Sequence, residues 1–324
     1  MVKIRYDMAW GNPFFLLEIL NGHYYPQLHF DVTSLIYGPY EGTQELIDVS
    51  HKVIKETTGN VYKHLLITNG ASSAVNMLLR FYKERGVEMV FTTKYGYPSY
   101  EEMIRRAGLI RICNLNHPLA SSFTNPDGVD KVVRLIDSPD NPLGKQFSGG
   151  SYGRDIWDNV YHNIIYTQDK MTQPTHRFLV GSYSKLLGVA GARIGFIATN
   201  DRMAYEALLA QSVNETAGVS RLSQSLIVDI MKKLDLNRFM EMGRDYLFHN
   251  KGEFQKLEYL FDGQPLNEAG MFYSPKADPK AVDLLDRVGV GYVRLDDETI
   301  RISMGQTKDI VKDGIKAILK EDRK

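Results

Sequence analysis

Short apolar runs alternate with segments of helical periodicity through the first two thirds of the chain. The first run, His64–Gly70, ends at an Asn-Gly pair, and residues 71–86 then carry apolar side chains at helical spacing. A second helical segment lies at 98–108, and further strand-like runs lie at 87–93, 109–115, 132–139, 153–158, 176–182 and 193–199. Parallel strands need crossover helices that cover both faces of their sheet. The alternation therefore predicts an α/β fold with a mostly parallel sheet covered by helices on both faces.

The pattern changes near Asn200. Two longer helical segments, at 201–213 and 220–261, replace the alternation. The strand-like runs and the final helical segment that follow lie at 270–275, 289–295, 299–305 and 308–321. We therefore predict a large domain over residues 30–215. A smaller α+β domain, with lid segments, is expected from the chain termini at 1–29 and 216–324.

The balance of charge limits the kinds of partner. Among the 324 residues, 39 Lys and Arg side chains balance 39 Asp and Glu side chains, so no excess cation is available for nucleic acid or a membrane surface. We therefore predict a small-molecule partner. A single cysteine, Cys113, and the absence of zinc-ligand spacing indicate a reducing, cytoplasmic location and no metal site. The N-terminus lacks the apolar stretch of a signal peptide, and no run approaches the ~18 apolar residues of a membrane span.

The turn after the first strand-like run is a candidate binding feature. In the stretch TNGASSA (Thr68–Ala74), Gly70 allows the backbone to approach a ligand closely. Ala71 and Ser72 begin the helix that follows. The free N–H groups and the positive dipole end of this helix point toward the turn, which favours a phosphate there. The plainer alternative is that the glycine and the serines only cap the helix.

The segment GSYSKLLGVAGARIG (Gly181–Gly195) places Lys185 between small hydroxyl residues and near an arginine. Ser182, Ser184 and Arg193 are residue types that bind phosphate. A cationic, partly desolvated setting lowers the pKa of a lysine and supplies the free amine that condenses with an aldehyde. An aldehyde cofactor that carries a phosphate group would use all of these residues together.

This segment resembles the Schiff-base lysine signature of the fold-type I pyridoxal-phosphate enzymes, the aspartate aminotransferase superfamily. Three more stretches resemble motifs of that family, in the family's order. IDSPDNPLG (Ile136–Gly144) is similar to its N-P-x-x-P-x-G stretch, with Ser138 in place of the first Asn. WDNVYHN (Trp157–Asn163) is similar to its D-x-x-Y segment, and TIRISMG (Thr299–Gly305) to its late arginine strand. The resemblance covers nearly the whole chain and implies a sheet of the seven-stranded type in the large domain.

The resemblance also implies roles in binding pyridoxal 5′-phosphate and an amino acid. The implied catalytic residues are Lys185, which forms the internal aldimine, Asp158, which pairs with the pyridine nitrogen, and Tyr161, which contacts the phenolic oxygen. The other implied cofactor contacts are Gly70, Ala71, Ser72, Tyr97, Asn141, Ser182, Ser184, Arg193 and, from the neighbouring subunit of a dimer, Tyr37. The implied substrate contacts are Arg301, which clamps the α-carboxylate, together with Asn141 and Gly11.

Each assignment has a structural alternative. Asp158 taken alone is equally a strand-end cap, Tyr161 a core aromatic and Tyr37 a turn filler. Arg301 taken alone is a half-exposed strand arginine. The joint occurrence of these residues in the family's order favours the functional interpretation.

The resemblance implies an aminotransferase that acts on an amino acid as a homodimer with composite active sites. Only 13 residues separate Gly144 from Asp158, and this short connection is similar to that of the alliinase and tryptophan-aminotransferase-related branch. A decarboxylase or a carbon–sulfur β-lyase stays an alternative, because the cofactor permits all three reactions. A regulatory or binding protein that has kept the fold is the non-enzyme alternative, although the presence of both Lys185 and Asp158 argues against it.

Overall fold

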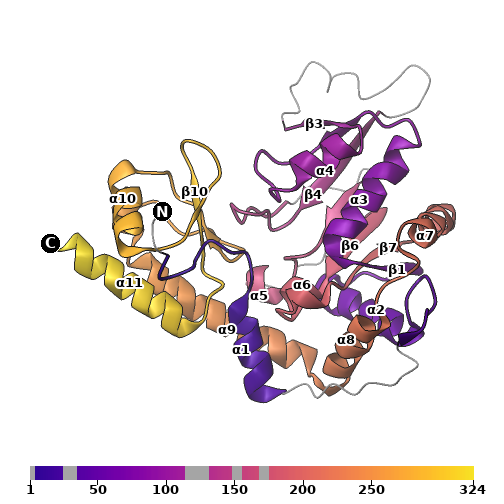
Figure 1. The fold of residues 1–324 in the computed structure, drawn as a ribbon, viewed down its shortest axis with the longest axis horizontal. Helices are drawn as coiled ribbons and strands as arrows, with labels where there is room; N and C mark the ends of the chain where they lie inside the picture. Colours follow the sequence, from indigo (N-terminus) through magenta and orange to yellow (C-terminus); the bar gives the residue numbers. More distant parts are fainter. Residues whose placement is uncertain (1–3, 25–34, 114–130, 148–154, 168–174) are drawn as a thin grey trace.

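The computed structural model describes residues 4–24, 35–113, 131–147, 155–167 and 175–324 (Figure 1). Its main feature is a seven-stranded sheet in the order β1-β7-β6-β5-β4-β2-β3. The strands are β1 (His64–Thr68), β2 (Met89–Phe91), β3 (Ile110–Ile112), β4 (Val132–Asp137), β5 (Ile156–Asp158), β6 (Phe178–Ser182) and β7 (Gly195–Thr199). β7 alone runs opposite to the other strands, so its pairs with β1 and β6 are antiparallel, and the pairs from β6 to β3 are parallel. The predicted α/β fold with a mostly parallel sheet is confirmed.

Both faces of this sheet are buried. Along β1, Leu65 and Ile67 join one cluster of buried side chains, whereas Leu66 joins another. The helices that contribute to the cluster around Leu66 are α3 (Gly70–Lys83), α4 (Tyr100–Arg106) and α7 (Arg202–Thr216). The opposite face is covered by α2 (Gln44–Thr58), on which α8 (Arg221–Lys233) packs. This double coverage explains why the strands read as almost continuous apolar runs.

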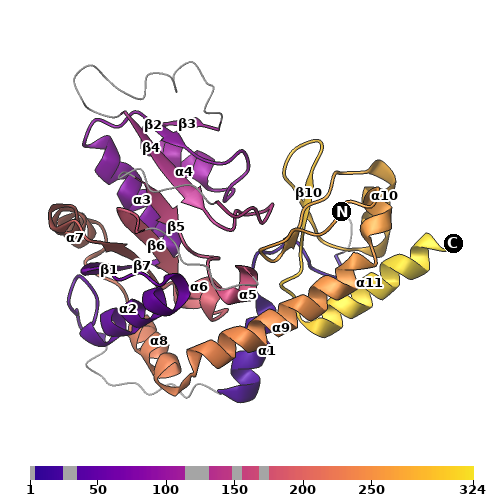
Figure 2. The ribbon, with the colours of Figure 1, turned by 180° about the vertical axis from the view of Figure 1, so that it is seen from behind.

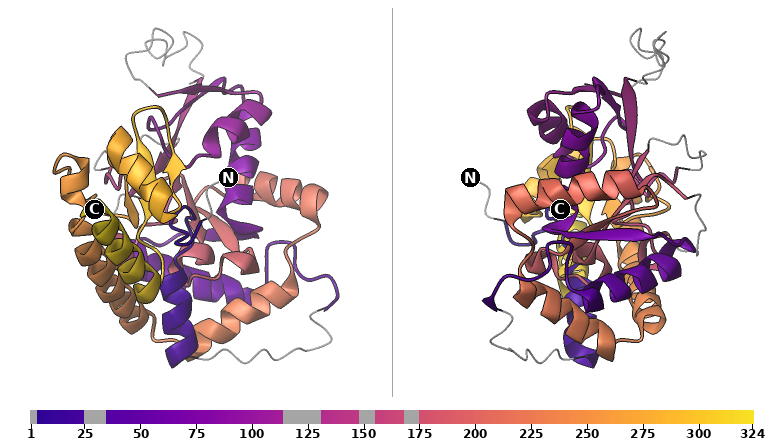
Figure 3. Two further views of the ribbon diagram at one scale, coloured as in Figure 1. Left: turned by 60° about the vertical axis from the view of Figure 1, so that its left-hand side comes forward. Right: turned by 90° about the vertical axis from the view of Figure 1, so that its right-hand side faces the viewer.

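A second, three-stranded antiparallel sheet lies to one side of the first, at the left of Figure 1 and the right of Figure 2. Its strands, in spatial order, are β8 (Phe272–Tyr273), β10 (Ile300–Ser303) and β9 (Val293–Arg294). The helices of this part are α10 (Pro279–Val288), α11 (Lys308–Asp322) and the long α9 (Leu236–Gln255). Along its length α9 contacts α11, the N-terminal helix α1 (Phe14–His23) and the short α5 (Ile164–Thr167). Figure 3 shows α11 beside α9 from the side.

Some helices differ from the predicted segments. The segment at 220–261 divides into α8 and α9, because Asp235 caps the second helix by accepting a hydrogen bond from Arg238 N. Helices α1, α2 and α10 lie outside the predicted segments. The predicted domain limits stay a prediction, and the limit at residues 29–30 falls outside the described residues. No helix in the described part of the chain is long and apolar enough to cross a membrane.

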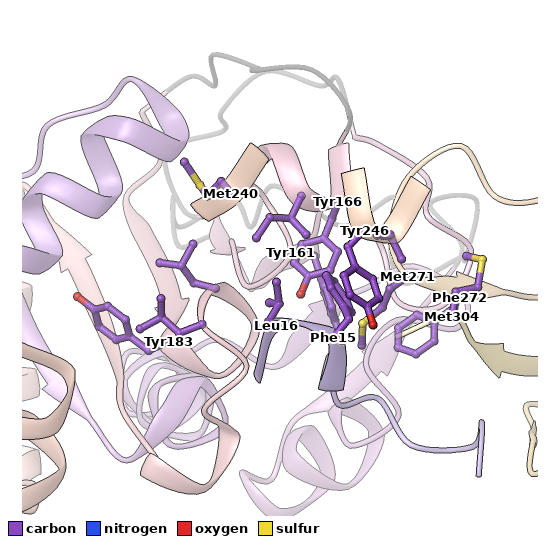
Figure 4. Close-up of a cluster of buried hydrophobic side chains, with 14 of the residues drawn as sticks. Phe15, Leu16, Tyr161, Tyr166, Tyr183, Met240, Tyr246, Met271, Phe272 and Met304 are labelled. Atoms are coloured by element: carbon purple, nitrogen blue, oxygen red, sulfur yellow. The ribbon is translucent and has the colours of Figure 1, made fainter. Parts of the chain in front are cut away.

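A cluster of buried side chains joins the two sheets (Figure 4). Phe15 of α1 stacks on Tyr246 of α9, with ring centroids 5.4 Å apart. Tyr161, which follows β5, meets Phe272 of β8 edge to face at 6.1 Å. The N-terminal segment is tied to the small sheet as well, since Ser303 N donates to Met8 O at 2.7 Å. These contacts hold the end of β5 close to the small sheet.

Candidate active site

A cavity of about 190 Å³ lies at the carboxyl ends of three neighbouring parallel strands. β4 ends at Asp137, β5 at Asp158 and β6 at Ser182, and all three residues line the cavity. This edge is where ligands bind to open α/β sheets. The other lining residues are Asn12, Ala71, Ser72, Val75, Tyr97, Tyr100, Met103, Asn141, Val160, Tyr161, Ser184, Lys185, Ala190 and Arg193.

One end of the cavity is formed by the amino end of α3 and by Arg193. Ala71 and Ser72 lie in the first turn of α3, where N–H groups have no partner within the helix, and the side chain of Asn69 makes no capping hydrogen bond. Gly70 has a positive φ of 76°, and a Cβ at this position would lie 2.7 Å from Arg193 Nη2. Only glycine therefore fits here without displacing the arginine. This end carries positive charge and free N–H groups, which suit an anion.

The two serines at this end have different surroundings. Ser182 caps the short helix α6 (Tyr183–Leu186), because its Oγ accepts a hydrogen bond from Ser184 N at 3.1 Å. Ser182 Oγ also donates to Ile194 O at 3.3 Å. No hydrogen bond from the described residues engages Ser184 Oγ. The hydroxyl of Ser184 is therefore the one that a ligand finds available.

Lys185 lines the same cavity. Its Nζ donates a 2.7 Å hydrogen bond to Gly11 O, and its main-chain oxygen accepts one of the same length from Tyr166. Burial, followed by the positive charges of Arg193 and Arg301, lowers the pKa of Lys185 to about 8. Roughly a tenth of this amine is therefore unprotonated at pH 7 and about half at pH 8, which supplies the neutral form that a nucleophile or a base requires.

The opposite end is formed by buried carboxyl and phenol groups. Asp158 Oδ2 accepts a hydrogen bond from the Tyr100 hydroxyl at 2.8 Å, and Oδ1 accepts one from Val160 N at 3.1 Å. Burial raises the pKa of Asp158 to about 6, although both hydrogen bonds act in the opposite direction. The ring of Tyr97 meets that of Tyr100 edge to face at 5.6 Å. This acidic end suits a cation or a hydrogen-bond donor.

Arg301 lies on β10, behind the lining residues. Its Nη1 donates to Asn141 Oδ1 at 3.2 Å, and its Nη2 donates to Ala9 O at 3.1 Å. The guanidinium lies 4.5 Å from the centre of the Phe272 ring, and Nε is buried with no hydrogen-bond partner. Arg301 is only 7% exposed, yet it forms no ion pair with any Asp or Glu of the described ranges. This planar cation is therefore available to a carboxylate.

The structure brings most of the predicted site residues together. The predicted residues that line the cavity are Ala71, Ser72, Tyr97, Asn141, Asp158, Tyr161, Ser182, Ser184, Lys185 and Arg193. Gly70, Gly11 and Arg301 adjoin them. Tyr37 lies elsewhere: it is 83% exposed and lines a surface groove with Leu35, Ile36 and Arg221. Within one chain, Tyr37 takes no part in the cavity.

Several lining residues fall outside the predicted set: Asn12, Val75, Tyr100, Met103, Asp137, Val160 and Ala190. Sequence signals exist for two of them. Asp137 lies two residues before the end of the predicted run at 132–139, Asp158 ends the predicted run at 153–158, and Tyr100 follows Tyr97 by three residues. Register then pairs Asp137 with Asp158 across β4 and β5. That pairing is a property of the sheet and is not visible in either stretch of sequence by itself.

Comparisons with known proteins agree with this geometry. A family model described as aminotransferase class I and II matches residues 26–318. The (5-formylfuran-3-yl)methyl phosphate transaminase of Methanocaldococcus jannaschii is 23% identical over 319 residues, which cover 86% of this chain and 82% of that protein. Alliin lyase 2 of Allium sativum is 27% identical, but over only 36% of this chain and 24% of that protein.

The fold has close counterparts among solved structures. A double mutant of the aspartate aminotransferase of Thermus thermophilus superposes with a TM-score of 0.74 and covers 99% of this chain and 92% of its own. Sequence identity in that superposition is 15%, so the match concerns the fold alone. The Methanocaldococcus transaminase and the Thermus aminotransferase thus match over most of both chains, whereas alliin lyase 2 matches over one segment only.

Proposed function

The chain belongs to the aminotransferase class I and II family, whose members use pyridoxal 5′-phosphate, and we propose that it transfers the amino group of an amino acid in the cavity around Lys185. One observation carries the assignment of the site. The amine of Lys185 lines one cavity together with groups that suit an anion and groups that suit a cation. A phosphorylated pyridine aldehyde carries an anion, a ring nitrogen that can hold a proton and a carbonyl carbon that an amine attacks.

The residues present fit the phosphate and the ring nitrogen of this cofactor. The free N–H groups around Ala71 and Ser72, the unengaged hydroxyl of Ser184 and the guanidinium of Arg193 would hold the phosphate. The carboxylate of Asp158 would pair with the protonated ring nitrogen. Gly70 supports this assignment, because the absence of a Cβ lets its main chain lie close to the Arg193 guanidinium.

The remaining ring contacts come from aromatic and amide side chains. Tyr161 and Asn141 would contact the phenolic oxygen, and Tyr97 and Val160 would lie against the ring. When bound, the cofactor supplies an aldehyde that condenses with amines and a ring that withdraws electrons from the substrate Cα. The protein supplies orientation, charge and a proton carrier.

Lys185 is the proton carrier in this proposal. Its lowered pKa of about 8 keeps part of the amine neutral, and the carbonyl oxygen of Gly11 holds Nζ in place by a hydrogen bond. With substrate bound, the free Nζ would take the proton from the substrate Cα. It would then deliver that proton to the aldehyde carbon of the cofactor, which is the other carbon attached to the transferred nitrogen. This is general acid–base work by a positioned amine.

Arg301 would orient the substrate by its α-carboxylate. The guanidinium now donates to the neutral acceptors Asn141 Oδ1 and Ala9 O, and a charged carboxylate is a stronger acceptor than either. A planar, two-point contact fixes the direction of the bonds at the substrate Cα.

We propose transamination rather than β-elimination or decarboxylation. The relative that covers most of this chain is a transaminase, whereas the similarity to alliin lyases is confined to about a third of it. We therefore propose kinship with the alliinase branch only for the 116 residues that match.

We also propose that the active form is a homodimer. Tyr37 is 83% exposed, and it lies beside Leu35 and Ile36, which are 70% and 65% exposed. Burying these side chains against a second copy would remove apolar surface from water and carry the phenol of Tyr37 toward the partner's phosphate end.

One experiment tests the reaction type. The holoenzyme is mixed with single amino acids in the absence of a keto acid, and the cofactor is then extracted and identified. We expect one equivalent of keto acid and stable pyridoxamine phosphate, after which the reaction stops. Arg301→Lys should require about tenfold more amino acid for half conversion, because a lysine offers no planar fork. Arg294→Lys, on the exposed part of the neighbouring β9, should leave that requirement unchanged.

Two outcomes would contradict the proposal. Steady release of carbon dioxide or pyruvate without a keto acid indicates a decarboxylase or a lyase. A holoenzyme that no amino acid converts indicates a protein that binds the cofactor without this reaction.

A further inference from the structure

A second buried carboxyl group lies beside Asp158. β4 and β5 are parallel, and their register pairs Asp137 with Asp158, each at the last position of its strand. Residues paired in this way point to the same face of a sheet. Both side chains line the cavity, and the two residues are 5% and 8% exposed.

The two carboxyl groups differ in their hydrogen bonds. Both oxygens of Asp158 accept one, from Tyr100 and from Val160 N. Asp137 Oδ2 accepts one from Asn141 N at 3.0 Å, whereas Oδ1 is buried and has no partner. In the part of the chain that the structure describes, no other buried carboxylate oxygen lacks a partner. An orphaned acceptor of this kind is costly unless it carries a proton and donates it.

The charged groups nearest to Asp137 are other carboxylates, and their negative charge disfavours its ionised form. The titratable groups that act on it are Asp158 on β5, Asp140 in the following loop, Tyr100 on α4 and Tyr161 after β5. No Lys or Arg of the described ranges forms an ion pair with it, and neither Lys185 nor Arg193 is among the groups that mainly set its pKa. Asp155, equally buried at the start of β5, shows the contrast, because Arg134 pairs with it. Two unpaired negative charges side by side in a dry site are strongly disfavoured.

We propose that Asp137 is a positioning residue that stays protonated in the working enzyme, so that the Asp137–Asp158 pair carries one negative charge and Asp137 Oδ1–H donates a hydrogen bond into the cavity. The single charge matches one ring cation, and the donor helps to align the ring by bonding to an acceptor atom of the ligand, because a protonated ring nitrogen accepts no hydrogen bond. This inference rests on the proposed function for the identity of the ligand.

Burial, together with the neighbouring charges of Asp158 and Asp140, raises the pKa of Asp137 to about 8. The folded protein therefore holds this proton over a pH range in which the unfolded chain, with a carboxyl pKa near 4, has lost it. The free energy of unfolding accordingly falls as pH rises from about 4 to about 8. Asp137→Asn removes this contribution, because its amide has the same shape, a donor and no charge.

The test uses the holoenzyme at neutral pH and infrared difference spectroscopy. Wild type minus Asp137→Asn should show the C=O stretching band of a protonated carboxyl group, and this band should fade above about pH 8. The melting temperature of Asp137→Asn should exceed that of wild type by more at pH 8 than at pH 5. The control is Asp283→Asn, on the exposed face of α10, which should change neither measurement.

Cofactor affinity supplies a second measurement. Asp137→Asn should bind pyridoxal phosphate within about threefold of wild type at pH 7, and Asp137→Ala, which has no donor, about tenfold more weakly. Absence of the protonated band overturns the inference. So does an Asn variant that binds as weakly as the Ala variant, because an ionised carboxylate is then required. If Asp137→Ala does not fold, the infrared band and the Asn variant decide. A wild-type protein that binds no cofactor contradicts the proposed function instead.

Discussion

The two ends of the cavity are built in different ways. The anion-binding end consists of main-chain N–H groups, a serine hydroxyl and Arg193, and its parts come from two continuous stretches of sequence. The acidic end is assembled from Asp137, Asp158 and Tyr100, which lie on two strands and a helix. The first end depends on local backbone conformation, and the second depends on sheet register and burial. A ligand with an anion at one end and a cation at the other fits in a single orientation.

The largest difference between the ends should appear when Asp158 is changed. Asp158→Ala removes the charge that stabilises a ring cation, and this charge matters most in the transition state. We expect turnover to fall about 10³-fold and cofactor affinity to fall about tenfold or less. Steady-state kinetics at saturating cofactor, together with equilibrium binding, separate the two quantities. Equal losses in both would assign Asp158 a structural role, and the comparison of the two ends would then fail.

Arg193 should give the opposite pattern at the other end. Arg193→Ala removes a charge-assisted hydrogen bond to the phosphate, which does not change during the reaction. We expect cofactor affinity to fall between about tenfold and 100-fold, with turnover at saturating cofactor within about threefold of wild type. Arg202→Ala, on an exposed position of α7, is the matched control and should alter neither. A loss of turnover without a loss of affinity would place the phosphate elsewhere.

The difference between the ends also explains what the sequence predicts. The motifs around Gly70 and Lys185 are local, and the structure places most of their residues in the cavity as predicted. Asp137 and Tyr100 gain their positions from strand pairing and from a hydrogen bond between α4 and β5, which no short stretch encodes. Arg301 is predicted by resemblance alone, and its burial depends on Phe272 and the N-terminal segment. The seven strands follow from apolar runs, but their order follows from packing.

The smallest effect concerns the second subunit. If Tyr37 reaches the partner's phosphate end, a mixture of Lys185→Ala and Tyr37→Ala proteins should form hybrid dimers with one intact site each. We expect recovery of about a quarter of wild-type activity, because half of randomly mixed dimers are hybrids and each has one complete site. In the control mixture, Tyr259→Ala, a change at a different exposed tyrosine, takes the place of Tyr37→Ala. The activity of this mixture should equal that of the Tyr259→Ala protein it contains, with no gain on mixing. Dimers that form, as shown by sedimentation, without restored activity would remove Tyr37 from the site.

The central claim is that Lys185, in this cavity, is the residue that holds the cofactor. Reduction of the holoenzyme with borohydride fixes pyridoxal phosphate to the lysine that binds it, and peptide mapping then identifies that lysine. The account predicts a single modified peptide that contains Lys185, and no modification in Lys185→Ala. A label on another lysine, such as the buried Lys251 of α9, or a reduced protein without any label, would contradict it.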